Sequence, residues 1–249
     1  MKAWPYPRIF AHRGGGSLAP ENTLVAIRLG QSLGFRAHEF DVKLSKDAVS
    51  MLLHDSTLER TTTGKGRAAD FTWADLLKLD AGAWHSETFR GEHLASFEDA
   101  AKALRSKGTM ANVEIKPTPG FERDTGLQVA REAEAFWQGA DVAPLLSSFS
   151  FEALMAAKES APSLPRGWLA KELTPEDWER LEQLEAVSFH TDHKKLDPAA
   201  IPKLKDRHYR VMVYTVNDVA TAKRLFDAGV DGIFTDNLKE FAAAFPGYL

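Results

Sequence analysis

The sequence predicts an α/β protein, a closed (β/α)8 TIM barrel with a small insertion after a β-hairpin in its second unit. Apolar runs rich in β-branched residues alternate with amphipathic segments along almost all of the 249 residues, and eight of these runs can be strands. After residue 110 they recur at the spacing of consecutive βα units. Eight units in a chain of this length favour a closed barrel, although an open, doubly wound sheet also fits the alternation.

The expected strands are identified by their apolar content and by the turn residues that bound them. In chain order they are 8–11, 37–42, 110–115, 144–149, 166–170, 186–190, 210–216 and 232–235. Between them, residues 174–177 form a capping sequence with proline at the first helical position, and Asp197 before a proline does the same. Asn217 is expected to cap a helix over 218–228 that stops at Gly229.

The second unit departs from the simple alternation. Too few residues separate the strand that ends at 42 from the apolar run 49–54 for a crossover helix, so these cannot be consecutive parallel strands. The polar tip at 45–48 instead predicts a β-hairpin over 39–54, which sets His54 roughly opposite Glu39.

A long span from about 55 to 97 follows the hairpin. It is rich in threonine, glycine and charge, yet it also contains four large aromatic residues, Phe71, Trp73, Trp84 and Phe89. We expect an insertion that packs over one end of the barrel, with helix starts at Thr72 and Ser96. Residues 1–249 would then form a single catalytic domain.

Composition argues against several classes of protein. The chain has no cysteine, which excludes disulfides and thiolate zinc sites, and its net charge of −4 argues against a nucleic-acid partner. The first residues lack the apolar segment of a secretion signal. No run approaches the ~20 apolar residues that span a bilayer. We therefore expect a cytoplasmic protein without stable membrane insertion, and a homodimer is left open.

Two large polar side chains, His12 and Arg13, end the first expected strand, and Gly14, Gly15 and Gly16 follow them. Such glycines let the backbone turn sharply or approach a ligand closely. Histidine exchanges a proton near neutral pH, and the guanidinium fork suits phosphate or carboxylate. The plainer interpretation of this stretch alone is a strand-to-helix loop with an incidental surface pair.

Three acids follow on two neighbouring strands. Glu39 and Asp41 lie two residues apart, so they point to the same face of their strand. Alone they would fit an outward-facing charged pair. Glu114 and Lys116, however, share a face at the end of the next parallel strand, so the three acids can converge. Oxygen ligands of this kind suit Mg²⁺ or Ca²⁺ better than zinc.

The hairpin brings His54 back to the same end of the barrel, where barrel enzymes have their active sites. This set of residues fits the cleavage of a phosphodiester. A cation, Arg13 and Lys116 can neutralise charge on the non-bridging oxygens. Two imidazoles on opposite sides of phosphorus can act as acid and base.

The motifs resemble the glycerophosphodiester phosphodiesterase family, in the right order and over nearly the whole chain. The stretches are 11–23 (AHRGGGSLAPENT), 39–66, 112–117 (NVEIKP), 147–149 (SSF), 211–218 (VMVYTVND) and 229–237 (GVDGIFTDN). The long pattern HRG, PENT, E-x-D, HD and RTT-x-G is highly specific. The resemblance implies a barrel with a small insertion that hydrolyses glycerophosphodiesters to sn-glycerol 3-phosphate and an alcohol.

The resemblance also assigns roles to residues of this chain. The acid/base pair would be His12 and His54. The ligands of a divalent cation, Mg²⁺ or Ca²⁺, would be Glu39, Asp41 and Glu114. The phosphate contacts would be Arg13 and Lys116. Which histidine begins as the base, and whether water or a glycerol hydroxyl attacks first, stays open.

Four further residues lie near these motifs. Tyr214 stands where the family often has tryptophan, so an aromatic wall for the substrate is kept and a hydroxyl is added. Glu21, in the PENT motif, is interpreted as support for the arginine or a histidine, and Asp55 as a residue that orients His54 or holds its loop. His190, at the end of the sixth expected strand, is interpreted as structural.

Two alternative functions stay open at this point. A lysophospholipase D or a phosphatidylinositol-type phosphodiesterase would share the barrel and the histidines. A membrane substrate would favour an apolar rim, for which the four aromatic residues of the insertion are candidates. An inactive barrel that serves as a binding protein would be free to lose part of the site, yet every member is present.

Overall fold

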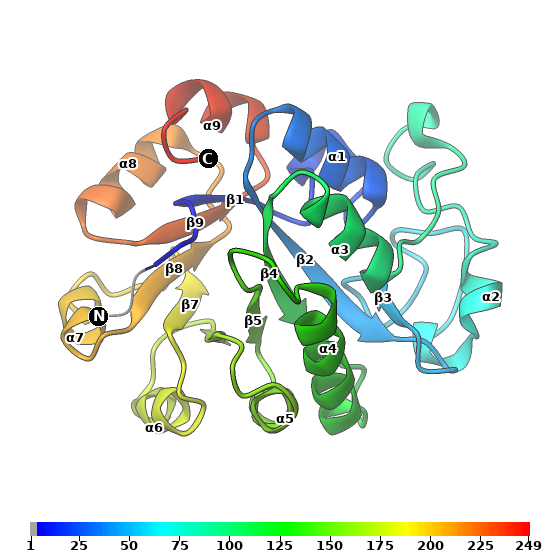
Figure 1. The fold of residues 1–249 in the computed structure, drawn as a ribbon. Helices are drawn as coiled ribbons and strands as arrows, with labels where there is room; N and C mark the ends of the chain where they lie inside the picture. Colours follow the sequence, from blue (N-terminus) through cyan, green and yellow to red (C-terminus); the bar gives the residue numbers. More distant parts are fainter. Residues whose placement is uncertain (1–3) are drawn as a thin grey trace.

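The computed structural model describes residues 4–249, in which eight parallel strands close into a barrel (Figure 1). These strands are β1 (Ile9–Ala11), β2 (Ala37–Leu44), β4 (Met110–Ile115), β5 (Leu145–Ser148), β6 (Arg166–Ala170), β7 (Ser188–Asp192), β8 (Arg210–Tyr214) and β9 (Gly232–Thr235). Each lies within two residues of its predicted bounds. Because β1 pairs with both β9 and β2, the sheet has no free edge between them, and the (β/α)8 barrel is confirmed over the open sheet.

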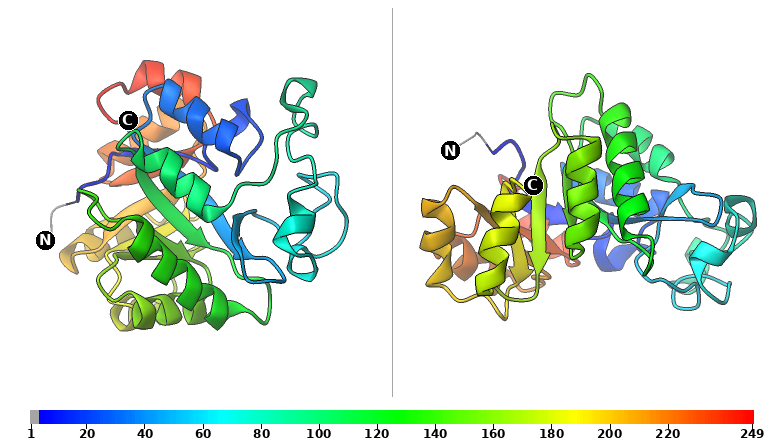
Figure 2. Two further views of the ribbon diagram at one scale, coloured as in Figure 1. Left: turned by 45° about the vertical axis from the view of Figure 1, so that its right-hand side comes forward. Right: turned by 90° about the horizontal axis from the view of Figure 1, so that it is seen from below.

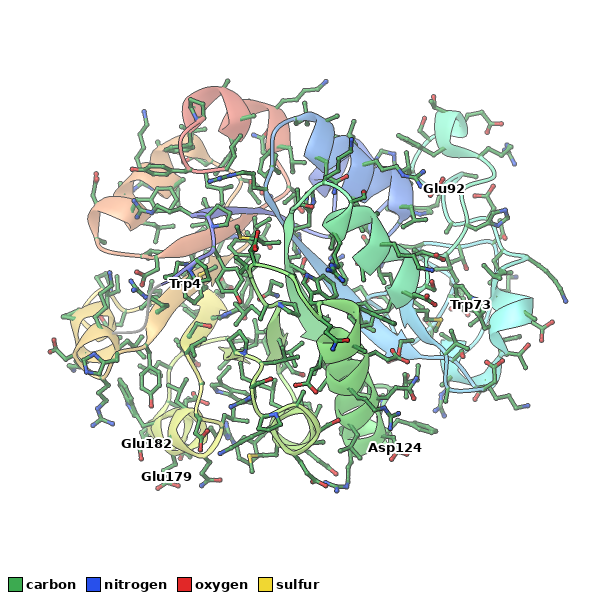
Figure 3. The ribbon with its side chains drawn as sticks, in the orientation of Figure 1. Trp4, Trp73, Glu92, Asp124, Glu179 and Glu182 are labelled. Atoms are coloured by element: carbon green, nitrogen blue, oxygen red, sulfur yellow. The ribbon has the colours of Figure 1, made fainter. Side chains whose placement is uncertain are left out.

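Helices lie around the outside of the strands (Figures 1 and 2). They are α1 (Leu24–Ser32), α3 (Phe97–Arg105), α4 (Glu122–Phe136), α5 (Phe151–Ser160), α6 (Pro175–Gln183), α7 (Ala200–Asp206), α8 (Val219–Asp227) and α9 (Leu238–Ala244). None of the helices in the described residues is both long and apolar enough to cross a bilayer. Figure 3 shows Asp124, Glu179 and Glu182 on the outer surfaces of α4 and α6, where all three are exposed.

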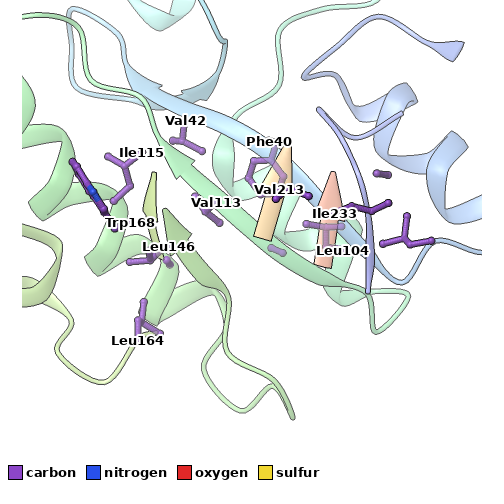
Figure 4. Close-up of a cluster of buried hydrophobic side chains, with 14 of the residues drawn as sticks. Phe40, Val42, Leu104, Val113, Ile115, Leu146, Leu164, Trp168, Val213 and Ile233 are labelled. Carbon is purple, nitrogen blue, oxygen red and sulfur yellow. The ribbon is translucent and has the colours of Figure 1, made fainter. Parts of the chain in front are cut away.

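The alternation along β2 decides which way the acids point. Phe40 and Val42 are fully buried in the core cluster between strands and helices (Figure 4). Their neighbours Glu39 and Asp41 therefore point into the barrel, where they line a cavity. An outward-facing charged pair at this position is wrong.

Side-chain caps set most of the helix starts. The capping box of α6, between Thr174 and Asp177, is confirmed. The prediction for α8 is wrong by one residue, because Asp218, not Asn217, accepts an N–H of the first turn, at 2.6 Å. Asp197 accepts the backbone N–H two residues on, so it caps the turn before α7 rather than the helix itself.

The hairpin is confirmed. Strand β3 (Ser50–Leu52) runs antiparallel to β2, with Val42 opposite Leu52, and the N–H of Leu53 donates to the carbonyl of Asp41 at 3.2 Å. This register sets His54 within one residue of the predicted position opposite Glu39.

The segment between β3 and α3 lies beside the barrel and contains η2 (Ala68–Asp70), α2 (Trp73–Leu76) and η3 (Glu87–Phe89) (Figure 2). Its start sites at Thr72 and Ser96 are confirmed as side-chain caps. Its buried apolar residues form a separate cluster with Met51 of β3; they are Leu53, Leu58, Ala68, Leu76, Ala81 and Leu94. Glu92 accepts the N–H of Val25 at 3.2 Å, which attaches the segment to the start of α1.

Candidate active site

Three carboxylates converge at the carboxyl ends of β2 and β4. Asp41 of β2 pairs in register with Glu114 of β4, and Glu39 lies two residues before Asp41 on the same face. One oxygen from each of the three side chains lies within 4.8 Å of the other two, and all three residues are buried. The barrel therefore brings together the three acids that the sequence predicts as a group.

The charges of this triad are only partly compensated. Burial, reinforced by the charge of Asp41, raises the pKa of Glu39 to about 8 and that of Glu114 to about 7. Burial also acts to raise the pKa of Asp41, but Lys116 and His54 outweigh it and lower that pKa to about 2. Lys116 Nζ lies 2.7 Å from Glu114 and 3.6 Å from Asp41. A cluster of hard oxygen donors with excess negative charge fits a divalent cation.

His12 lies at the end of β1 and is held by a carboxylate that follows β9. Its Nδ1 is 2.6 Å from Asp236 Oδ1, which leaves Nε2 on the side of the triad, 3.8 Å from Glu39 Oε2. Asn217 fixes this partner with its side chain. Its Nδ2 donates to Asp236 Oδ2 at 3.0 Å, and its Oδ1 accepts the backbone N–H of Asp236 at 2.7 Å. Burial acts to lower the pKa of His12, but Asp236 and Glu39 raise it above its usual value.

Neither Asp236 nor Asn217 was predicted as a site residue, although both lie in the motifs 211–218 and 229–237. The available signal was position: an acid directly after the last strand of a barrel lies at its catalytic end.

His54 follows the hairpin and is held by the adjacent residue. Its Nδ1 lies 2.6 Å from Asp55 Oδ1. Lys43, fully buried on β2, donates to the carbonyl oxygen of His54 at 3.1 Å and also to that of Asp55, so it fixes the backbone of both. Burial lowers the pKa of Lys43 to about 8. Burial, with Lys116 opposing protonation, also lowers the pKa of His54.

Arg13 connects the first loop to the acids. Its backbone N–H donates to Glu39 Oε2 at 2.9 Å, and its Nη1 donates to Glu21 Oε1 at 2.8 Å. The loop that follows is tightly packed: Gly16 has a φ of 57°, and a Cβ there would lie 2.3 Å from the carbonyl oxygen of Asp236. Only glycine meets both conditions.

Asn22, also in this loop, donates to Asp41 Oδ2 at 2.8 Å and accepts the backbone N–H of Asp41 at 3.1 Å. It was not predicted to contact the site. It orients one of the three acids from outside the barrel strands.

These groups surround one cavity of about 190 Å³. Phe149, 43% exposed, forms part of its wall, with Lys116 Nζ 5.5 Å from its ring and Tyr214 packed edge-on at 5.9 Å. The lining residues are His12, Arg13, Glu39, Asp41, His54, Asn112, Glu114, Lys116, Ser147, Phe149, Leu169, His190, Tyr214, Thr215 and Phe234. Of the predicted site residues, only Glu21 and Asp55 lie outside this lining, where they contact Arg13 and His54.

His190 lies within β7 rather than at its end, because the strand continues to Asp192. Its Nε2 bonds to Ser188 Oγ at 2.8 Å, and burial lowers its pKa to about 3. The ring is therefore a neutral part of the cavity floor.

Comparisons with known proteins agree with this geometry. The model of the Glycerophosphoryl diester phosphodiesterase family matches residues 12–240. A glycerophosphodiester phosphodiesterase of Caldanaerobacter subterraneus is 32% identical over 92% of this chain and 93% of its own, and one of Bacillus subtilis is 29% identical over 96% and 86%. The solved structure of a phosphodiesterase from Oleispira antarctica is 31% identical, covers 97% of this chain and 98% of its own, and has a TM-score of 0.90. The chain is a phosphodiesterase that belongs to the glycerophosphoryl diester phosphodiesterase family.

Proposed function

We propose that the protein hydrolyses glycerophosphodiesters to sn-glycerol 3-phosphate and an alcohol, with a divalent cation and two histidines. The observation that carries this proposal is the meeting of a buried carboxylate triad with two histidines, each paired with a carboxylate through Nδ1. The Oleispira antarctica phosphodiesterase, which has the same fold, is described in complex with the product sn-glycerol-3-phosphate, and this supports the proposed product class.

Glu39, Asp41 and Glu114 are the residues that would hold the cation, and Mg²⁺ or Ca²⁺ suits their oxygens. When bound, such an ion supplies positive charge that polarises the phosphoryl oxygens. The raised pKa values of Glu39 and Glu114 support this role, because they reflect the cost of holding three buried negative charges together, and a bound cation would offset that cost.

The histidines carry the proton transfers in this proposal. Each ring has its Nδ1 on a carboxylate, so each presents Nε2 as the nitrogen that exchanges a proton with the substrate. One imidazole removes the proton of the attacking hydroxyl or water, and the other protonates the departing alkoxide. Arg13 and Lys116 stand beside the triad, where their charges stabilise the phosphate oxygens as the P–O bond breaks.

The metal and the substrate class can be tested together. Protein treated with a chelator and then dialysed is assayed with glycerophosphocholine and glycerophosphoglycerol, with Mg²⁺, with Ca²⁺ or with neither, and released sn-glycerol 3-phosphate is quantified. We expect turnover only after an ion is restored, and we expect Glu114→Gln to abolish ion binding in calorimetry. Full turnover without an ion would contradict the metal proposal, and no glycerol phosphate under either ion would contradict the whole function.

Lysophospholipids are the competing substrates. Among the aromatic residues of the insertion, Phe71 and Trp73 are half-buried against the apolar cluster of that segment, whereas Trp84 is exposed. Because two of the four aromatic candidates pack within the insertion, the four do not form one continuous apolar rim, and this favours small, water-soluble diesters over lipids. We expect a higher kcat/KM for glycerophosphocholine than for lysophosphatidylcholine, and the reverse order would favour a lysophospholipase D.

A further inference from the structure

Arg60, in the first part of the insertion, contacts two carboxylates from different parts of the chain. Its Nε and Nη2 donate to Asp55 Oδ2 and Oδ1 at 2.6 and 3.1 Å. Its Nη1 and Nη2 donate to Glu21 Oε2 and Oε1 at 2.7 and 2.8 Å. One planar guanidinium therefore makes four hydrogen bonds to two acids, a geometry that its rigid fork allows and an ammonium group does not.

Each of these acids holds a group of the active site on its other side. Glu21 Oε1 also accepts from Arg13 Nη1 at 2.8 Å, and Asp55 Oδ1 lies 2.6 Å from His54 Nδ1. Within the described residues, Arg60 is the side chain that contacts both acids. A continuous series of charged contacts thus runs from Arg13 to His54 along the rim of the cavity, with Arg60 at its centre.

We propose that Arg60 is a positioning residue that couples the phosphate side of the active site to the imidazole side. The proposal rests on the roles of Arg13 and His54 in the proposed function. Arg60 does not line the cavity, and its hydrogen bonds go to Glu21 and Asp55, so it acts through these two acids. Its side chain is 43% exposed, so its removal leaves the barrel core intact.

The charge of Arg60 also bears on His54. The charged groups that face this imidazole are Asp41, Lys116, Arg13 and Asp55. With Arg60 present, the charge of Asp55 is shared between the guanidinium and the imidazole. Without Arg60, that carboxylate acts on His54 alone, so protonated His54 is favoured and its pKa rises.

The first experiment compares Arg60→Ala, Arg60→Lys and Arg90→Ala in steady-state assays of metal-loaded protein with glycerophosphocholine. Arg90 is a matched control, because it lies in the same insertion, is 64% exposed and forms its ion pair with Glu87, a residue outside the active site. We expect Arg60→Ala to lower kcat/KM at least ~10-fold through a lower kcat and a higher KM, since small displacements of such groups are costly to rate. Arg60→Lys should recover only a minor part, and Arg90→Ala should match the wild type.

The pH profile gives a second readout that loss of packing would not move. We expect the limb of the kcat/KM profile that reports His54 to shift to higher pH in Arg60→Ala, because the pKa of His54 rises: this is the acidic limb if His54 begins as the base and the basic limb if it begins as the acid. Both limbs should stay in place in Arg90→Ala.

A mutant cycle tests the coupling itself. Glu21→Gln and Asp55→Asn alter residues that no direct hydrogen bond joins, so without a bridge their effects on kcat/KM should multiply. We expect a clear departure from multiplicativity when Arg60 is present, and independent effects in the Arg60→Ala background. If Arg60→Ala lowers the melting temperature, its kinetic effects could come from instability. In that case the same cycle is measured in the Arg60→Lys background, where independent effects of Glu21→Gln and Asp55→Asn would support the proposal.

Wild-type kcat/KM and an unshifted pH profile in Arg60→Ala would overturn the proposal. Multiplicative effects of Glu21→Gln and Asp55→Asn with Arg60 present would also overturn it. Failure of the proposed function is a different result, because the wild-type protein itself would then release no glycerol phosphate.

Discussion

The two sides of the active site hold chemically similar histidines by different means. His12 follows β1, and its partner Asp236 follows β9, so the pair is set by two strands that are hydrogen-bonded neighbours in the barrel. His54 follows the hairpin, and its partner Asp55 is the next residue. Neither belongs to a barrel strand, and their loop is held by the buried ammonium of Lys43.

This difference shows how many residues orient the imidazole on each side of the active site. On the barrel side, one carboxylate, Asp236, is bound by Asn217 through both its side chain and its backbone N–H, and it does most of the orienting. On the hairpin side, the orientation is divided among Asp55, Lys43 and Arg60, each from a different segment. We therefore expect a single loss to be more damaging on the barrel side, unless the imidazole itself is removed.

The largest effects should come from the imidazoles, and they should be similar on the two sides. His12→Ala and His54→Ala should each lower kcat by at least ~10², because each removes one proton transfer. His93→Ala, at an exposed histidine of the insertion, is the control and should match the wild type. A near-normal rate in either of the first two variants would remove that side from the mechanism.

The carboxylate partners should separate the two sides. Asp236→Asn should lower kcat at least ~10-fold, because carboxylates that orient a functional histidine through Nδ1 are costly to replace, and Asp55→Asn should lower it less. The reason is that Arg60 already neutralises part of the charge of Asp55. Pre-steady-state assays at saturating substrate measure both rates. Equal losses in the two variants would contradict the claim that the two histidines are oriented by different means.

Lys43 offers a smaller test on the hairpin side alone. Lys43→Met removes the donor to the carbonyls of His54 and Asp55, and we expect kcat to fall about tenfold, because the loop loses its anchor to β2. Lys46→Met, an exposed lysine in the same hairpin, is the matched control. A rate equal to that of the control would show that Asp55 and Arg60 suffice.

The smallest effect on turnover at neutral pH should come from His190, which bears on stability instead. The unfolded chain binds a proton here near pH 6.5, whereas the folded protein does so only near pH 3. The difference adds to the free energy of unfolding. This contribution of neutral His190 is complete above pH 6.5 and is lost as the pH falls toward 3, with a total on the order of a few kcal/mol.

His190→Asn should accordingly flatten the dependence of the unfolding free energy on pH between 6.5 and 4.5, as measured by urea titration. His93→Asn, at an exposed histidine of the insertion, is the control for the loss of one imidazole. An unchanged slope in His190→Asn would mean that this barrel histidine does not govern acid unfolding.

Much of this architecture can be predicted from the sequence because buried positions recur with the period of the strand or helix, so apolar residues repeat at that spacing. All eight barrel strands, the hairpin and the clustering of Glu39, Asp41 and Glu114 follow from short-range alternation and strand adjacency. Asn217 shows where such prediction fails. Asparagine and the adjacent Asp218 are both good helix caps, so local sequence does not decide between them; in the fold Asp218 caps α8, and Asn217 binds Asp236.

The contacts that the sequence does not predict are those between segments far apart in the chain. Arg60 reaches Glu21 across 39 positions, and His12 reaches Asp236 across 224. No periodicity encodes such distances, because they depend on how the barrel closes and where the insertion lies. The single catalytic domain, the cytoplasmic location and the homodimer stay predictions.

The pairing of β1 with β9 also bears on biosynthesis. On a ribosome, a nascent chain that has not yet emerged beyond β8 already holds both imidazoles, all three acids of the triad and the whole insertion, but it lacks the carboxylate that orients His12. It also lacks the neighbour on which β1 must dock to complete the ring. We therefore expect full activity to appear only after the last βα unit has been made and has closed onto the first.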